Sequence, residues 1–189
     1  MNELQLIRNQ LALERAHASA VANACATVLQ SEDPAGPASA SLGQFRRACV
    51  DYLACVLAWF EERDQRLAEL VQVRSGATDP ARRAFEEVLG RPGRSREALA
   101  KLEAACAGTA GAGAAARQAW REFGEYFNGT WSTRRDALET LLASNTRASD
   151  WRTLGGIDAD SILEERRRYA LVAAQVPRGV HLGTGAEHA

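Results

Sequence analysis

The residue types and spacing that could do chemistry in this chain are those of a metal site inside a helical bundle. In such a bundle a histidine and a carboxylate four residues apart lie on one face of a helix, so both can reach one ion. At the inward positions of two long helical patterns the chain instead has Phe60 with Asp64, and Trp131 with Arg135. The spacing of a metal site is therefore present, while most of its ligands are replaced.

His17, with Glu14 and Asp64 as its possible bundle-facing companions, is the remaining candidate for binding a metal ion. A transition metal needs further ligands and an acceptor behind the histidine, so the competing interpretation is a partly buried, hydrogen-bonded histidine. Glu14 interrupts an apolar stripe. It is either a ligand, a buried hydrogen-bonding group or a side chain that reaches the edge of the helix face.

Asp64 and Arg135 form a second candidate arrangement. An unpaired buried carboxylate is costly, so an Asp64–Arg135 ion pair in place of a metal bridge is chemically sensible. The alternative is that both side chains rotate and face water.

Phe60 and Trp131 are expected to meet in the bundle centre, because both are larger than an imidazole and can fill the volume of an ion and its ligands. Together with the other aromatic residues at helical spacing, they are interpreted as core.

Apolar residues at a period of 3.6 predict the elements that position these side chains. The stripes and their glycine, proline and capping signals indicate helices at about 3–30, 40–74, 79–90, 95–106, 114–144 and 160–175. Gly90-Arg-Pro-Gly93 is expected to separate the third from the fourth of these. Asp158 or Asp160 can cap the last one.

The predicted fold is all-α, an antiparallel up-down four-helix bundle with a C-terminal helical extension. Residues 1–154 form the bundle and residues 155–176 a helix packed on it, whereas residues 177–189 form a flexible tail. The last helix is expected to dock through Ile162, Leu163, Tyr169 and Val172.

Composition restricts the class of protein. The 189 residues are 46% apolar, with 23 basic and 24 acidic residues and a net charge of -1. This balance argues against a nucleic-acid partner, since nucleic-acid binders usually have a basic excess. We expect no membrane association and a cytoplasmic location, because no apolar run approaches about 18 residues and no secretory signal is visible.

Several polar residues have ordinary structural interpretations. The charge runs Glu61-Glu62 and Glu164–Arg168 are expected to be solvated helix faces. The four cysteines stand singly and are interpreted as buried free thiols. His181 and His188 fall in the predicted tail, where an unstructured segment is favoured over an adventitious metal clip.

The order of these signals resembles the hemerythrin-like (HHE cation-binding) family over residues 3–154. Leu13-Glu-Arg-Ala-His17 is similar to the first-helix motif, and Ser149-Asp-Trp151 to the segment that often closes the domain. The second-helix motif falls on Phe60 and Asp64. The fourth-helix pair falls on Trp131 and Arg135, and the third-helix histidine falls near Arg94 or Ser95, where there is none. The resemblance implies a helical bundle, and iron as the family's cofactor.

The sequence thus favours a metal-free relative of that family, for which no cofactor is expected and whose role is to bind a protein partner or its own copy. The alternative is a metal-binding or oxygen- or redox-sensing protein that uses His17 and nearby carboxylates, with iron as the cofactor. No phosphate loop, nucleophile elbow or catalytic triad is present, so a non-enzymatic role is favoured.

Overall fold

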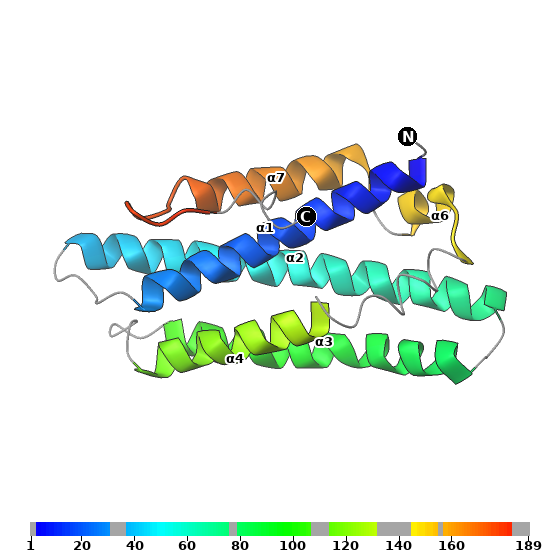
Figure 1. The fold of residues 1–189 in the computed structure, drawn as a ribbon, viewed down its shortest axis with the longest axis horizontal. Coiled ribbons are helices and arrows are strands. Elements are labelled where there is room, and N and C mark those ends of the chain that lie inside the picture. The colour runs from blue at the N-terminus through cyan, green and yellow to red at the C-terminus, as the bar shows by residue number, and fades with distance from the viewer. Residues whose placement is uncertain are drawn as a thin grey trace.

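The computed structural model describes residues 3–30, 37–75, 79–106, 114–131, 145–154 and 157–182, and in these ranges it is helical without strands. Four long helices contact one another in a ring: α1 (Glu3–Gln30), α2 (Pro37–Ser75), α3 (Asp79–Cys106) and α4 (Ala114–Trp131). Successive helices run in opposite directions along the long axis of the molecule (Figure 1). The all-α prediction is confirmed for the described residues.

Two short elements complete the structure. α6 (Ala148–Thr153) lies at the start of α1, and α7 (Ala159–Ala173) lies along α1 and α2. Asp158 caps α7, because its carboxylate accepts from the backbone N–H of Ser161, whose hydroxyl in turn accepts from the N–H of Asp158. The sequence offered Asp158 and Asp160 as caps, and Asp158 is the residue that caps the helix.

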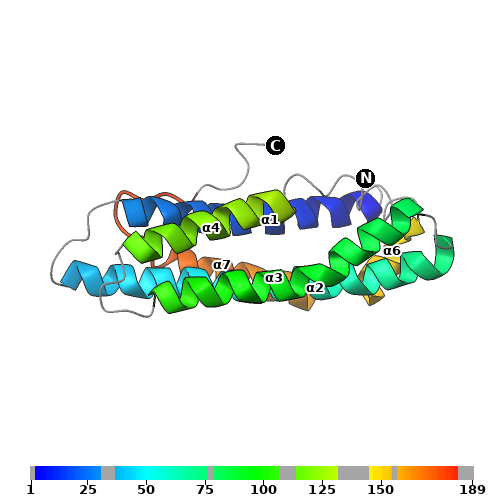
Figure 2. The same cartoon turned by 90° about the horizontal axis from the view of Figure 1, so that it is seen from below.

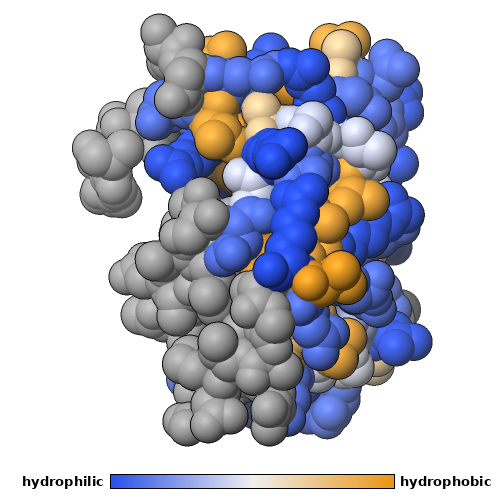
Figure 3. Space-filling view, turned by 90° about the vertical axis from the view of Figure 1, so that its right-hand side faces the viewer, coloured by the Kyte–Doolittle hydropathy of each residue, from blue (hydrophilic) through white to orange (hydrophobic). Residues whose placement is uncertain are grey.

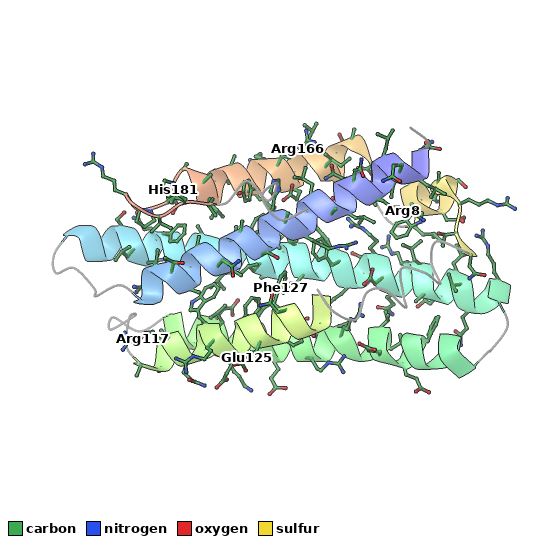
Figure 4. All side chains as sticks on the ribbon, in the orientation of Figure 1. Arg8, Arg117, Glu125, Phe127, Arg166 and His181 are labelled. Carbon is green, nitrogen blue, oxygen red and sulfur yellow. The ribbon has the colours of Figure 1, made fainter. Side chains whose placement is uncertain are left out.

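Apolar side chains form two buried clusters. The larger one lies between the four long helices and includes Phe45, Leu53, Phe60, Trp120, Phe123 and Phe127. Phe127 points from α4 into the bundle (Figure 4). The smaller cluster joins α1, α2 and α3 to Trp151 of α6. Figure 3 looks onto the end of the bundle near α6, where hydrophobic and hydrophilic residues are interspersed over the coloured surface.

α3 differs from the prediction, because it continues through Pro92 where two helices were expected. A proline inside a helix removes one N–H donor and its ring pushes away the preceding turn, which bends the helix without necessarily ending it. Figure 2 shows α3 bent along its length. Near the bend, the Arg94 guanidinium donates to the carbonyl of Glu87 at 3.4 Å.

α4 is described as far as Trp131, and residues 132–144 of the expected helix lie outside the described residues. The side chain of Trp131 and the residue Arg135 therefore have no described position, and their expected roles remain predictions.

The docking face of α7 is largely as expected. Val172 is buried, and Ile162 and Tyr169 are partly buried against the two clusters. Leu163 was expected on the same face, but it is 62% exposed. The reason is helical phase, because Leu163 lies next to Ile162 in sequence and so points about 100° away from it. Arg166 points away from the bundle on the outer side of α7 (Figure 4).

The predicted tail also differs where it is described. Val180 and Leu182 pack against the larger core cluster together with Val176. Residues 177–182 therefore lie against the bundle, whereas residues 183–189 lie outside the described residues.

Candidate functional site

Buried charged side chains lie along the interior of the bundle, and they carry the chemistry of the described structure. Glu165 and Arg91 are each 1% exposed, Asp64 is 2% exposed, and Glu14 and Arg63 are also buried. Because a buried charge is costly unless it is paired and hydrogen-bonded, the partners of these groups define what the interior can do.

The first group joins α7 to α1 and α2 through Glu165. Tyr52 of α2 donates its hydroxyl to Oε1 of Glu165 at 2.6 Å, and Nδ1 of His17 lies 3.0 Å from the same oxygen. A carboxylate only accepts, so the imidazole donates to it in the tautomer that carries its proton on Nδ1. The other oxygen, Oε2, is buried and has no hydrogen-bond partner among the described residues.

Tyr169, one turn after Glu165 on α7, completes this group. Its ring stacks on the imidazole of His17, with centroids 3.9 Å apart and an interplanar angle of 11°. Burial raises the pKa of the Tyr52 hydroxyl, and the hydrogen bond to Glu165 raises it further. Burial and the charge of Glu165 also raise the pKa of Tyr169. Both phenols are therefore proton donors at neutral pH, not phenolate ligands.

The second group lies one turn away on α1. Nη1 of Arg63 donates to Oε2 of Glu14 at 2.9 Å, and Nε2 of Gln10 donates to Oε1 at 3.1 Å. Both charged side chains are at most 6% exposed. Of the three interpretations left open for Glu14, the structure gives it the environment of a buried hydrogen-bonding group.

The third group contains Asp64, whose partner is on α3. Nη1 of Arg91 donates to Oδ2 of Asp64 at 2.9 Å, and Nη2 of Arg91 lies 3.8 Å from Glu87. The alternative that Asp64 faces water is wrong, because the residue is buried and ion-paired. The proposed partner Arg135 lies outside the described residues, so that ion pair stays a prediction; among the described residues, Arg91 pairs with the carboxylate. The bend at Pro92 follows directly after Arg91 in α3.

A fourth group involves Glu61, which was expected to be solvated. Glu61 is buried, and its Oε1 has no hydrogen-bond partner among the described residues. Burial raises the pKa of its carboxyl, whereas a hydrogen bond with Ser95 lowers it. Ser95 in turn bonds the hydroxyl of Tyr126. Glu62 does face solvent, so the prediction is correct for one residue of that run and wrong for the other.

In the described part of the chain, the partners of these groups are other protein side chains. His17 and Asp64 have separate partners, and arginine guanidiniums occupy the carboxylates of Glu14 and Asp64. Within the described ranges, no three histidine, cysteine, aspartate or glutamate side chains are placed to hold one ion. Phe60 is buried in the core at the position four residues before Asp64.

Sequence reasoning missed several members of these groups. Glu165 was assigned to a solvated charge run and Arg91 to a helix break. Neither Tyr52 nor Arg63 was considered. A signal for Glu165 did exist, because Ile162, Glu165, Tyr169 and Val172 follow the spacing of one helix face. A carboxylate on such a face indicates a buried polar contact.

Comparison with family models, with curated proteins and with solved structures finds no match to this chain. None of the helices in the described part of the chain has both the length and the apolar character needed to cross a membrane.

Proposed function

We propose that this chain is a metal-free, hemerythrin-like bundle of up-down topology, and that it acts as a protein-interaction or regulatory module and not as an enzyme. The observation that carries the proposal is the placement of Arg91 on Asp64, deep in the bundle. A guanidinium supplies the positive charge that a carboxylate in this position would otherwise obtain from a cation. The buried Glu14–Arg63 pair supports the proposal in the same way.

The outer side of α7 supports an interaction role. Leu163 and Leu171 are 62% and 53% exposed, and they lie two turns apart on the side of α7 that faces away from α1 and α2. Exposed leucines at this spacing offer a contact for a second copy of the chain or for another protein. The test is sedimentation velocity over a range of concentrations. The proposal expects self-association that weakens in Leu163→Ser/Leu171→Ser, or a monomer that binds a purified partner through these leucines.

The metal-free part of the proposal is tested by metal analysis and by melting with and without EDTA. We expect no stoichiometric metal and an unchanged melting temperature, since removal of a structural metal would remove folding free energy. Phe60→His provides a sharper comparison, because it places a histidine four residues before Asp64. Zinc binding by Phe60→His should remain weak and become tighter when Arg91→Ala is added.

The alternative function is metal binding or redox sensing through His17 and nearby carboxylates, with iron as the cofactor. The observation in its favour is Oε2 of Glu165, which lies next to the imidazole of His17 and has no hydrogen-bond partner among the described residues. Stoichiometric iron in the purified protein, an absorption band from that iron and a large drop in melting temperature with EDTA would establish this alternative and end the metal-free proposal.

A further inference from the structure

A pocket of about 250 Å³ lies where the start of α7 passes over α1 and α2. Its volume is below the roughly 300–1,000 Å³ of pockets for drug-sized ligands, so it suits a molecule of amino-acid size. Glu14 and Ser161 line it, and these residues lie one turn before His17 and Glu165 on their helices. The pocket therefore continues the same seam that holds the Glu165 group.

Two side chains give the pocket an apolar wall. Trp59 of α2 and Leu154, which follows α6, both line it and are partly buried. The Trp59 ring also lies under the guanidinium of Arg168, 5.8 Å from the ring centroid. The indole is therefore held between α2 and α7, and it offers a flat surface for an apolar or aromatic group.

The mouth of the pocket carries charges of both signs that are free to rearrange. Arg66 and Glu62 pair on the surface of α2, and their side chains are 50% and 58% exposed. Exposed pairs of this kind contribute at most about 1 kcal/mol, so a ligand can separate them at little cost. Asp158, at the start of α7, adds a second exposed carboxylate to the lining.

The floor of the pocket is different, because its charges are fixed. Glu14 and Arg63 form the buried ion pair described above and neutralise each other. Among the described lining residues, the charges available to a ligand are therefore one guanidinium, on Arg66, and two carboxylates, on Glu62 and Asp158. A purely anionic ligand would meet the excess of negative charge, and a purely cationic ligand would leave Arg66 displaced from Glu62 without a new partner.

We propose that this pocket binds a small zwitterion, namely a free α-amino acid with a flat apolar side chain. Arg66 binds the ligand carboxylate through two parallel N–H donors, and Glu62 and Asp158 bind its ammonium group. Trp59 and Leu154 contact the side chain. The inference deepens the proposed regulatory function and rests on it, because a ligand that touches both α2 and the first turn of α7 would hold α7 against the bundle.

The experiment is calorimetric titration of the full chain with each free amino acid, together with two analogues of phenylalanine. Phenethylamine keeps the ring and the ammonium group, and 3-phenylpropionate keeps the ring and the carboxylate. We expect an aromatic amino acid to bind, and both analogues to bind at least about tenfold more weakly. Hydrogen exchange in α7 should slow when that amino acid is added.

Variants and a matched control assign the binding to the pocket. Arg66→Gln and Glu62→Gln should each weaken binding by about tenfold. Glu97→Gln and Lys101→Gln alter an equally exposed ion pair with the same spacing on α3, and they should leave the affinity unchanged. All four side chains are exposed, so the folded structure is preserved in each variant.

Three results would overturn the inference. The first is that no amino acid binds at about 10 mM. The second is that phenylalanine and one of its analogues bind with equal affinity. The third is that the variants of α2 and those of α3 lose the same amount of affinity. None of them bears on the chelation and sedimentation tests, so the proposed function can stand if the amino-acid site fails.

Discussion

Nδ1 of His17 and Oε1 of Glu165 lie 3.0 Å apart, although 148 positions separate them in the chain. The contact ties the last helix to the first, and Tyr52 adds a donor from α2 to the same oxygen. Because a buried carboxylate without donors is costly, any other rotation of α7 would bury Glu165 unfavourably or expose it. One polar group therefore selects the orientation in which α7 packs, which apolar contacts alone would specify less strictly.

The hydrogen bond from Tyr52 gives the first prediction. Tyr52→Phe removes the hydroxyl and leaves the buried Glu165 with His17 as its remaining described donor. Hydrogen bonds to charged groups contribute about 1.5–3 kcal/mol, so the free energy of unfolding should fall by that amount in urea titrations. Glu164→Gln is the control, since it alters exposed ion pairs of the same helix and should change stability by less than about 1 kcal/mol. Equal effects of the two variants would show that Glu165 is not held by Tyr52.

The Asp64–Arg91 pair gives the second prediction. Arg91→Met leaves a buried carboxylate without its guanidinium and should lower the free energy of unfolding by about 3–5 kcal/mol. Adding Asp64→Leu should recover most of the loss, because replacing both members of a buried ion pair with apolar residues is often neutral. The measurement is a double-mutant cycle in urea. Additive losses from the two changes would contradict a direct buried contact.

The helices could be predicted from the sequence wherever an apolar stripe or a capping residue is not contradicted by a proline or glycine signal. The apolar stripes place α1 and α2 almost at their actual bounds, and the Asp158 cap fixes the start of α7. The prediction fails at Pro92, because proline and glycine signal a break but do not exclude a bent helix that is held by packing on both sides. Contacts between α3 and α2, such as that of Arg91 with Asp64, then keep the bent helix in place.

The candidate site was less predictable for a different reason. His17 was singled out by its place in the motif Leu13-Glu-Arg-Ala-His17, but its partner lies on the last helix and was hidden among charged neighbours at 164–168. Glu61 and Glu62 make the same point, since adjacent residues on a helix point about 100° apart and one of the two is buried. A charge run therefore says little about which of its members faces inward. That depends on how the helix is rotated against its neighbours.

Glu61 gives the third prediction, which concerns pH. Its burial raises the pKa of the carboxyl above the unfolded value of about 4.3. The folded protein therefore retains this proton more strongly than the unfolded chain does, and the favourable contribution is present at low pH and lost as pH rises through the folded pKa. Glu61→Gln carries no ionisable group and can still bond Ser95. It should melt higher than the wild type at pH 7, with a difference that disappears below about pH 4.

The exposed neighbour Glu62 supplies the control for this experiment. Glu62→Gln should change the melting temperature by a similar small amount across pH 5 to 8, because an exposed carboxylate keeps its charge throughout that range. A lower melting temperature of Glu61→Gln at pH 7 would show that the charged carboxylate is stabilised in the folded protein. In that case the arginines near it, Arg96 and Arg91, would outweigh its burial.

Truncation of the C-terminal region gives the fourth prediction. Ending the chain after residue 156 removes α7, exposes the core surface under Val172 and leaves Tyr52 and His17 without Glu165. Burial of a valine contributes about 1.5–3 kcal/mol and the hydrogen bonds to the carboxylate a similar amount, so the free energy of unfolding should fall by more than about 3 kcal/mol.

Ending the chain after Val176 is the control. It removes only the partly buried Val180 and Leu182 from the described contacts, and should lower the free energy of unfolding by about 1 kcal/mol. Urea titrations and binding of a hydrophobic dye measure the two losses. If both truncated chains were as stable as the full chain, α7 would not be an integral part of the fold, and the contact between His17 and Glu165 would have no role in holding it.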